Sequence, residues 1–172
     1  MAKAQSELED IARRGAVMAG NAFLSVLLLK GAPSHEERGG AKLLSGADGE
    51  ALRAALQALG YAPEDWAGLA IWDGQGNLLD AELLREAVCA LDPSTLVMCD
   101  KEAANAVREA YADDLSLLES FEEAMLLDGL VVQLAGMRVL SLGGFADALQ
   151  DAQSKQLMWR WLKQLPPLGE PY

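Results

Sequence analysis

Short, largely apolar runs alternate along the chain with segments in which apolar residues recur every three or four positions. The runs predict buried strands at 23–29, 68–72, 95–99 and 138–142. The periodic segments predict helices at 8–15, 51–59, 100–111 and 154–165, and the clearest helix follows Asp80 and carries Leu83, Leu84, Ala87, Val88 and Leu91. Strands that alternate with helices in this way favour a mostly parallel sheet covered on both faces.

The second half of the chain holds two weaker patterns. The acidic segment 115–127 predicts one or two further helical turns, and 130–134 is a strand-like run that precedes the predicted strand at 138–142. The Pro- and Gly-rich end, 166–172, reads as a tail. We therefore expect a single domain over 1–165 followed by this tail.

In a parallel sheet, ligands bind beyond the carboxyl ends of the strands. Here these ends are 30–40, 72–77, Asp100 and 143–145. The amides of the turn after the first strand are expected to be exposed and able to hold a phosphate or a base edge. The predicted lining of the ligand cleft is Lys30, Gly31, Ala32, Pro33, Ser34, Trp72, Asp100 and Gly144.

The net charge limits the classes of partner that we expect this protein to bind. The 172 residues include 26 acidic and 14 basic side chains, a formal net charge of −12, and 51% are hydrophobic. The hydrophobic content excludes a disordered chain, and the negative charge repels phosphate and disfavours a nucleic-acid binder. The first twenty residues mix charges of both signs, and no apolar run is long enough to span a bilayer, so we expect a cytoplasmic protein without a membrane segment.

Cysteine and histidine are scarce. Cys89, Cys99 and the single histidine, His35, are too few for a Cys-rich zinc or iron–sulfur site, and their spacing favours no metal. Both cysteines fall in apolar patterns, which predicts reduced thiols in the core. His35, Glu36 and Glu37 follow the first strand and are either candidate acid–base groups or solvated charges.

Several motifs stand at the ends of the predicted elements. Residues 26–34 read VLLLKGAPS, 39–46 read GGAKLLSG, 91–104 read LDPSTLVMCDKEAA, and 138–165 hold the last strand and a closing helix with Lys155, Trp159 and Leu162. In this order they resemble the uracil-DNA glycosylase superfamily, most closely its branch with an iron–sulfur cluster. The resemblance covers nearly the whole chain and implies a three-layer α/β/α sandwich with a short, mostly parallel sheet of about four strands.

The catalytic positions of that family are substituted. The acid that serves the attacking water falls on Gly31, the aromatic that stacks on a flipped uracil falls on Leu43, and the histidine of the last motif falls on Gly143. The uracil-reading asparagine is replaced within 70–73, and the four cluster cysteines are absent as a set, so no iron–sulfur cluster or other cofactor is expected. Base excision needs groups that stabilise a cationic sugar and a leaving anion, and their joint loss predicts an inactive relative.

We therefore expect a non-catalytic, uracil-DNA glycosylase-like module that binds a small ligand or a protein, with weak or absent DNA binding. The alternative is a divergent DNA-repair or nucleotide-processing hydrolase with a rearranged site, in which Glu36, Glu37 or Asp73 supplies the acid and His35 or Lys30 stabilises the leaving group. A third possibility is a subunit or homodimer that makes a protein contact around Trp72 and Met137. The sequence leaves the oligomeric state open.

Overall fold

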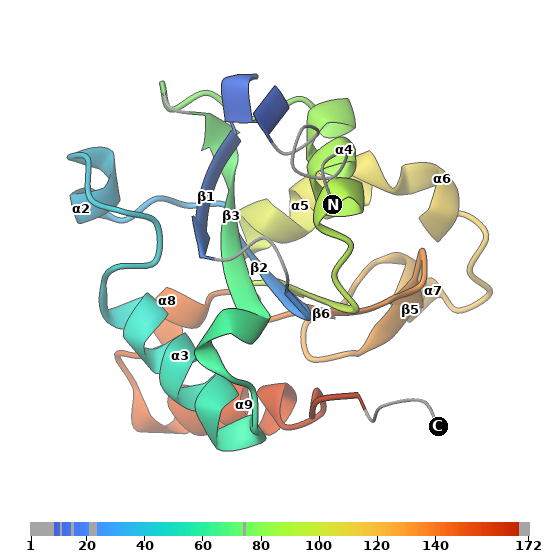
Figure 1. Ribbon diagram of the computed structural model, residues 1–172. Coiled ribbons are helices and arrows are strands. Elements are labelled where there is room, and N and C mark those ends of the chain that lie inside the picture. The colour runs from blue at the N-terminus through green and yellow to red at the C-terminus, as the bar shows by residue number, and fades with distance from the viewer. Residues whose placement is uncertain (1–8, 11, 15, 21–23, 74, 169–172) are drawn as a thin grey trace.

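The computed structural model describes residues 9–168 except 11, 15, 21–23 and 74. These residues form one six-stranded sheet in the order β1-β3-β2-β4-β6-β5 (Figure 1). Neighbours pair in parallel from β3 through β2 and β4 to β6, and β1 and β5 pair antiparallel at the two edges. The strands are β1 (Ala16–Gly20), β2 (Val26–Lys30), β3 (Trp66–Asp73), β4 (Thr95–Met98), β5 (Val132–Leu134) and β6 (Met137–Ser141).

Helices cover both faces of the sheet, as expected for an α/β protein. Larger helices are α3 (Ala47–Leu59), α4 (Ala81–Leu91), α5 (Lys101–Ala110) and α9 (Ala152–Leu162). Short helical turns are α2 (His35–Arg38), η1 (Pro63–Asp65), α6 (Ala112–Leu115), α7 (Phe121–Ala124) and α8 (Phe145–Ala148). Figure 1 shows α3, α8 and α9 grouped together and α4 and α5 grouped elsewhere.

The apolar runs form strands because their alternate side chains pack into two separate hydrophobic cores. Leu27 and Leu29 of β2 pack with α4 and α5, whereas Val26 and Leu28 pack with α3, α8 and α9. All residues of β2 and β4 are buried. A continuous apolar run is the pattern expected of a strand covered on both faces.

The sheet differs from the prediction in size and direction. It has six strands rather than about four, and it is mixed because both edge pairs are antiparallel. β1 was not predicted: it follows the segment 8–15, of which residues 9–10 and 12–13 are helical and Leu8, Ile11 and Gly15 lie outside the described residues. β5 and β6 form a hairpin through Ala135 and Gly136, whose φ angles of 50° and 84° suit a two-residue turn between antiparallel strands.

Element boundaries shift by a few residues from the predicted ones. β2 begins at Val26, and Phe23 lies outside the described residues. The acidic segment yields two single-turn helices, α6 and α7, and the last helix spans Ala152–Leu162 rather than 154–165. Across the described part of the chain, every helix is too short or too polar to cross a membrane.

Candidate functional site

A cleft of about 770 Å³ opens at the carboxyl ends of β2, β4 and β6. Lys30 lies at the end of β2, Asp100 after β4 and Gly144 after β6, and the first turns of α3 and α5 complete the walls. This is the edge of the sheet where a ligand is expected in an α/β protein. The cleft is lined by Lys30, Ala32, Pro33, Ser34, Glu36, Gly46, Ala47, Asp48, Cys99, Asp100, Lys101, Glu102, Gly143, Gly144, Phe145, Ala146, Asp147, Leu149 and Gln150.

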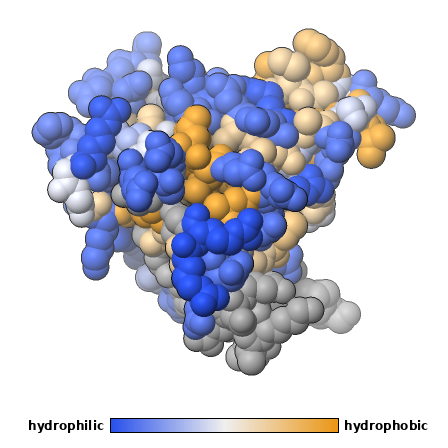
Figure 2. Space-filling view, turned by 90° about the horizontal axis from the view of Figure 1, so that it is seen from above, coloured by the Kyte–Doolittle hydropathy of each residue, from blue (hydrophilic) through white to orange (hydrophobic). Residues whose placement is uncertain are grey.

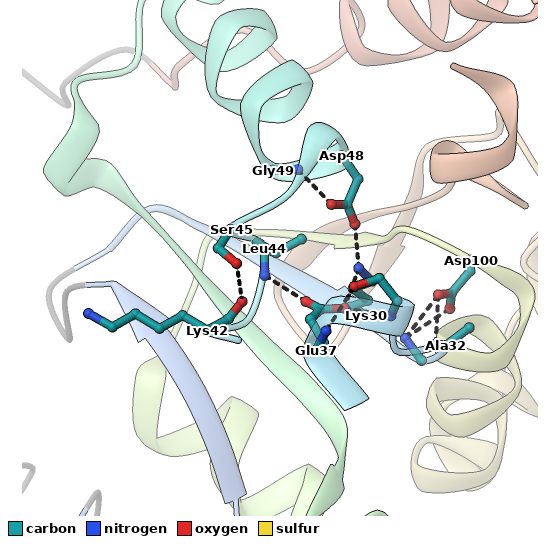
Figure 3. Close-up of polar contacts among 11 residues, drawn as sticks. Lys30, Ala32, Glu37, Lys42, Leu44, Ser45, Asp48, Gly49 and Asp100 are labelled. Atoms are coloured by element: carbon teal, nitrogen blue, oxygen red, sulfur yellow. Dashed lines mark hydrogen bonds and ion pairs between the residues drawn. The ribbon is translucent and has the colours of Figure 1, made fainter. Parts of the chain in front are cut away.

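A buried charge cluster forms one side of the cleft. The Lys30 ammonium lies 2.5 Å from Asp48 Oδ2 and 2.6 Å from Glu37 Oε1, as Figure 3 shows. The three side chains are almost entirely buried: 4% of Lys30, 4% of Glu37 and 11% of Asp48 remain exposed. Burial alone would favour neutral forms, so charges this deep are stable only when paired.

The pKa values in this cluster favour charged groups. Burial acts to lower the pKa of Lys30, but the bonds to Asp48 and Glu37 outweigh it and raise that pKa. Burial acts to raise the pKa of Glu37, but hydrogen bonds from Lys30 and from the amides of Ser34 and Leu44 lower it. Lys30 is therefore a protonated structural cation and not a neutral amine nucleophile.

Local sequence explains how Glu37 reaches Lys30. Ser34 caps α2 through its hydroxyl, which accepts from the Glu37 amide, while Glu37 Oε1 accepts from the Ser34 amide at 2.8 Å. This reciprocal capping box fixes the Glu37 side chain. Its second oxygen accepts from the Leu44 amide at 2.8 Å, so Glu37 also ties down the loop that leads into α3.

Asp100 closes the turn after β2. Its carboxylate accepts from the amides of Gly31 at 3.0 Å and Ala32 at 2.9 Å, in the turn drawn in Figure 3. As the N-cap of α5 it also accepts from the Ala103 amide at 2.9 Å. The expectation that the amides of the turn after β2 are exposed to hold a phosphate or a base edge is therefore wrong for Gly31 and Ala32. Both amides already bond to a carboxylate.

Gly31 itself leaves no space for a side chain. A Cβ at this position would lie 2.4 Å from the Ala103 amide nitrogen, 2.5 Å from Glu102 Cβ and 2.7 Å from Asp100 Oδ1. Gly143 disfavours a side chain for a different reason: its φ is +77°, and a Cβ would lie 2.4 Å from the end of the Asp128 side chain, at Oδ2. Leu43 is buried in the core beneath α3. These three positions present no functional side chain to the cleft.

The other residues singled out from the sequence are spread over two hollows. Lys30, Ala32, Pro33, Ser34, Asp100 and Gly144 line the main cleft, whereas Gly31 is buried behind it. Trp72 and Asp73 line a separate hollow of about 350 Å³. There the Asp73 carboxylate accepts from the amides of Gln75 and Asn77, which is the chemistry of a turn.

The candidate acid–base groups are divided between the two hollows, because Glu37 and Asp73 line the smaller one and Glu36 lines the main cleft. Glu36 lines the main cleft, His35 is exposed on α2, and Glu37 is buried beside Lys30. Asp48 was missed by the sequence analysis. It stands 18 positions after Lys30 in a different element, and no local pattern marks it as a partner.

Two further predictions need correction. Cys99 is buried, and burial raises the pKa of its thiol, but Cys89 is exposed and is not a core thiol. Met137 is buried in the core, so it contributes nothing to the apolar contact surface that was expected around Trp72 and Met137. Cys89 lies on the exposed side of α4 because the buried stripe of that helix is completed by Ala87, Val88 and Leu91.

The charge in the cleft is negative. Five carboxylates and two lysines line it. The helices whose first turns face it already carry acidic groups there: Asp48 accepts from the Gly49 amide in α3, and Asp100 caps α5. Helix N-termini attract anions through these amides, so their occupation by carboxylates disfavours an anionic ligand.

An apolar groove of about 560 Å³ continues from the cleft between α3 and α9. The two share Ala47, Phe145, Leu149 and Gln150 in their linings. Met158, Trp159 and Leu162 form the apolar wall, with Glu50 and Lys155 also present. The combined site is acidic at one end and apolar at the other.

Within the described ranges, no three His, Cys, Asp or Glu side chains gather in a way that could hold a metal ion.

Neither a scan against protein-family models nor a search of curated proteins gives a match to this chain.

Proposed function

We propose that this chain is a non-catalytic binding protein, related in organisation to uracil-DNA glycosylases, whose ligand occupies the cleft at the end of the parallel strands. The closure of Gly31 carries the proposal. In the resembling family an acid stands at this position, and here the Ala103 amide, Glu102 and Asp100 fill the space that any side chain would need.

The other substituted positions support the same conclusion. Gly143 lies where the family has a histidine, and Asp128 fills the space above it. Leu43 lies where the family has a stacking aromatic, and it packs into the core. Groups that stabilise developing charge each contribute orders of magnitude to a rate, so a site lacking all three has little means of excising a base.

The charge of the cleft indicates the class of ligand. A phosphate or a nucleic-acid strand would meet five carboxylates, whereas an ammonium or guanidinium group would be attracted to them. The adjoining groove offers Met158, Trp159 and Leu162 for an apolar portion. We propose a ligand that combines a cationic group with an apolar one.

An excision assay tests the non-catalytic part of the proposal. Single- and double-stranded DNA containing uracil is incubated with the protein, and release of the base is measured. We expect only background release. Turnover that falls to background in Glu36→Ala or Asp73→Ala, but not in the exposed control Glu64→Gln, would instead establish the alternative hydrolase.

A binding assay tests the ligand class. Titrations followed by NMR or thermal shift compare an arylalkylamine with the carboxylate of the same skeleton and with inorganic phosphate. We expect saturable binding of the amine only. Glu102→Gln/Asp147→Asn should weaken it, because these two acids, one half-buried and one exposed, line the cleft. Preference for phosphate or for the carboxylate would contradict the proposal.

The cell compartment is also a proposal. Cys89 and Cys99 are both free thiols. Free thiols are the rule in the reducing cytosol, and we propose a cytoplasmic location on this ground.

A further inference from the structure

Four large apolar side chains are exposed between positions 117 and 127, a segment that contributes no residue to the cleft lining. Leu117 is 83% exposed and Phe121 is 73% exposed, and Met125 and Leu127 are also exposed. We call these four residues, which lie on and beside α7, the α7 surface. Figure 2 shows exposed hydrophobic groups at the right-hand end of the molecule, where α6 and α7 lie in Figure 1.

The backbone holds this surface in place. The Arg108 guanidinium donates to the Met125 carbonyl at 2.8 Å, and Leu126 is buried in the core. Leu126 has a φ of +52°, an unusual conformation for a leucine, and it turns inward while both of its neighbours in the chain remain exposed. Phe121 and Met125 are four residues apart, with the Met125 amide bonded to the Phe121 carbonyl, so they share one side of the helical turn.

Acidic residues predominate along the chain around the α7 surface. The basic residue that contacts it, Arg108, is engaged with the Met125 carbonyl and the Asn105 side chain. The sequence from 109 to 137 contains seven acidic residues and no lysine or arginine. Arg85 pairs with Asp114 at 3.2 Å, and Asp128 accepts from the Ser141 hydroxyl. The other five, Glu109, Asp113, Glu119, Glu122 and Glu123, form no ion pair with any residue that the structure describes.

We propose that the α7 surface docks a basic amphipathic segment of a partner protein, with its apolar side chains on Phe121 and its neighbours and its lysines or arginines beside the unpaired carboxylates. An apolar patch rimmed by one sign of charge is typical of an interaction site. Helical segments bind such surfaces through anchors spaced three or four residues apart, and a methionine adapts its shape to the anchor.

Charge excludes a second copy of this chain as the occupant. Two α7 surfaces brought face to face would place the same unpaired carboxylates against each other, in a protein that already carries −12. Like charges at an interface oppose association. The same argument disfavours nucleic acid and anionic membranes.

The test uses three labelled peptides of equal length. The first places leucines along one face of a helix and lysines along the other, the second replaces its lysines by glutamates, and the third replaces its leucines by serines. Fluorescence anisotropy at about 0.15 M salt, where the Debye length is about 8 Å, measures binding to the full chain. We expect the first peptide to bind at least about tenfold more tightly than either of the others, since tenfold is about 1.4 kcal/mol.

Variants locate the binding. Leu117→Ser/Phe121→Ser should weaken binding of the first peptide at least about tenfold. Glu119→Gln/Glu122→Gln should weaken this binding and reduce its dependence on salt. Both pairs are exposed, so circular dichroism and the unfolding midpoint should stay unchanged. The cleft variant Glu102→Gln/Asp147→Asn should bind the peptide as the unmodified protein does, which separates this proposal from the proposed function.

Three results would overturn the proposal. One is equal binding of the lysine peptide by the unmodified chain and by Leu117→Ser/Phe121→Ser. Another is equal affinity for the leucine–lysine and serine–lysine peptides, which would mean that bulk charge alone attracts them. The third is a dimer in sedimentation analysis that dissociates in Leu117→Ser/Phe121→Ser, which would make a second copy the occupant.

Discussion

At Gly31 the absence of a side chain is a packing requirement, because groups of the turn between β4 and α5 fill the space where a Cβ would lie. Lys30, the preceding residue, has the opposite character: its long side chain is buried and holds two carboxylates. The pair thus determines what the end of β2 presents to the cleft. It is a cation paired with two carboxylates, beside a backbone position that has no room for a side chain.

Gly31→Ala should destabilise the protein by about 1–3 kcal/mol, the usual range for an overpacked site, because the new Cβ meets backbone and cannot relax by rotation. The measurement is the free energy of unfolding in urea. Gly39→Ala is the matched control, since its φ is −82° and its nearest atom would lie at 3.5 Å. It should change stability by no more than about 0.5 kcal/mol. Equal effects of the two substitutions would contradict the packing argument.

Lys30→Met should cost about 3–5 kcal/mol, because it leaves Glu37 and Asp48 buried without a cation. The exposed Lys42→Met should have little effect, and it provides the control. Urea unfolding at pH 7 distinguishes them. A loss at Lys30 no larger than that at Lys42 would show that the cluster adds nothing to stability.

The same cluster predicts how stability depends on pH. The pKa of Glu37 is lowered by folding, so its contribution is present above its ordinary value of 4.5 and is lost as the pH falls through the lowered value. The pKa of Lys30 is raised, so its contribution is present below 10.5 and is lost as the pH rises through the raised value. Unfolding measured across this range should show the difference between the unmodified chain and Lys30→Met shrinking in acid, where the carboxylates become protonated. A difference that is constant with pH would contradict it.

At the scale of elements, one side chain joins the end of β2 to the start of α5. Asp100 accepts from Gly31 and Ala32 on one side and from Ala103 on the other, over a sequence separation of 69 residues to Gly31. A carboxylate has enough acceptor positions for all three amides. Asp100 therefore both caps α5 and holds the turn that follows β2.

Asp100→Asn should destabilise the protein by about 1–3 kcal/mol, because an amide has only one acceptor oxygen and would turn its NH2 group toward at least one of the three backbone donors. Asp151→Asn is the control. Asp151 also caps a helix, α9, but it is exposed and accepts only from Ser154, and Asn and Asp are nearly equivalent caps. Thermal and urea unfolding should show a much larger loss at Asp100. Equal losses would mean that Asp100 acts as an ordinary cap.

For the whole molecule, the charge of −12 sets its response to polyanions. The lysines and arginines near the cleft do not concentrate there: Lys30 is buried and paired, and Lys101 shares the cleft with five carboxylates. Phosphate contacts supply most non-specific affinity for DNA, and base stacking adds about 1–3 kcal/mol per base where aromatics are available. The aromatic side chain in the cleft lining, Phe145, is buried, and carboxylates outnumber lysines there, so the cleft offers little of either contribution.

We therefore expect no measurable binding of single- or double-stranded DNA at about 0.15 M salt, and at most weak association at low salt around Arg38 and Lys42. Fluorescence anisotropy with a labelled oligonucleotide over a range of salt concentrations measures this. Micromolar or tighter binding that persists at the higher salt would show that a basic surface exists despite the total charge, and would favour a nucleic-acid enzyme.

The sequence by itself determined the inner part of the fold. β2, β3, β4 and β6 and the helices α4, α5 and α9 were predicted within a few residues, because burial on two faces or on one face leaves a local pattern of apolar positions. The predicted succession of strands and helices also identified which residues lie at the carboxyl ends of the parallel strands. The sequence also showed that two positions at these ends, Gly31 and Gly143, carry no side chain.

Only the tertiary structure decided the pairing of the edge strand and the roles of the charged side chains. β1 is a short edge strand whose partner, β3, lies some 50 positions away in the sequence, so its pairing leaves no local signal. Asp48 and Asp100 matter through atoms brought to them by other elements, and the same residues would be unremarkable at a helix start elsewhere. Whether a carboxylate is a solvated charge, a cap or a buried ion partner depends on desolvation and on its neighbours in space, and these are set by how the elements pack.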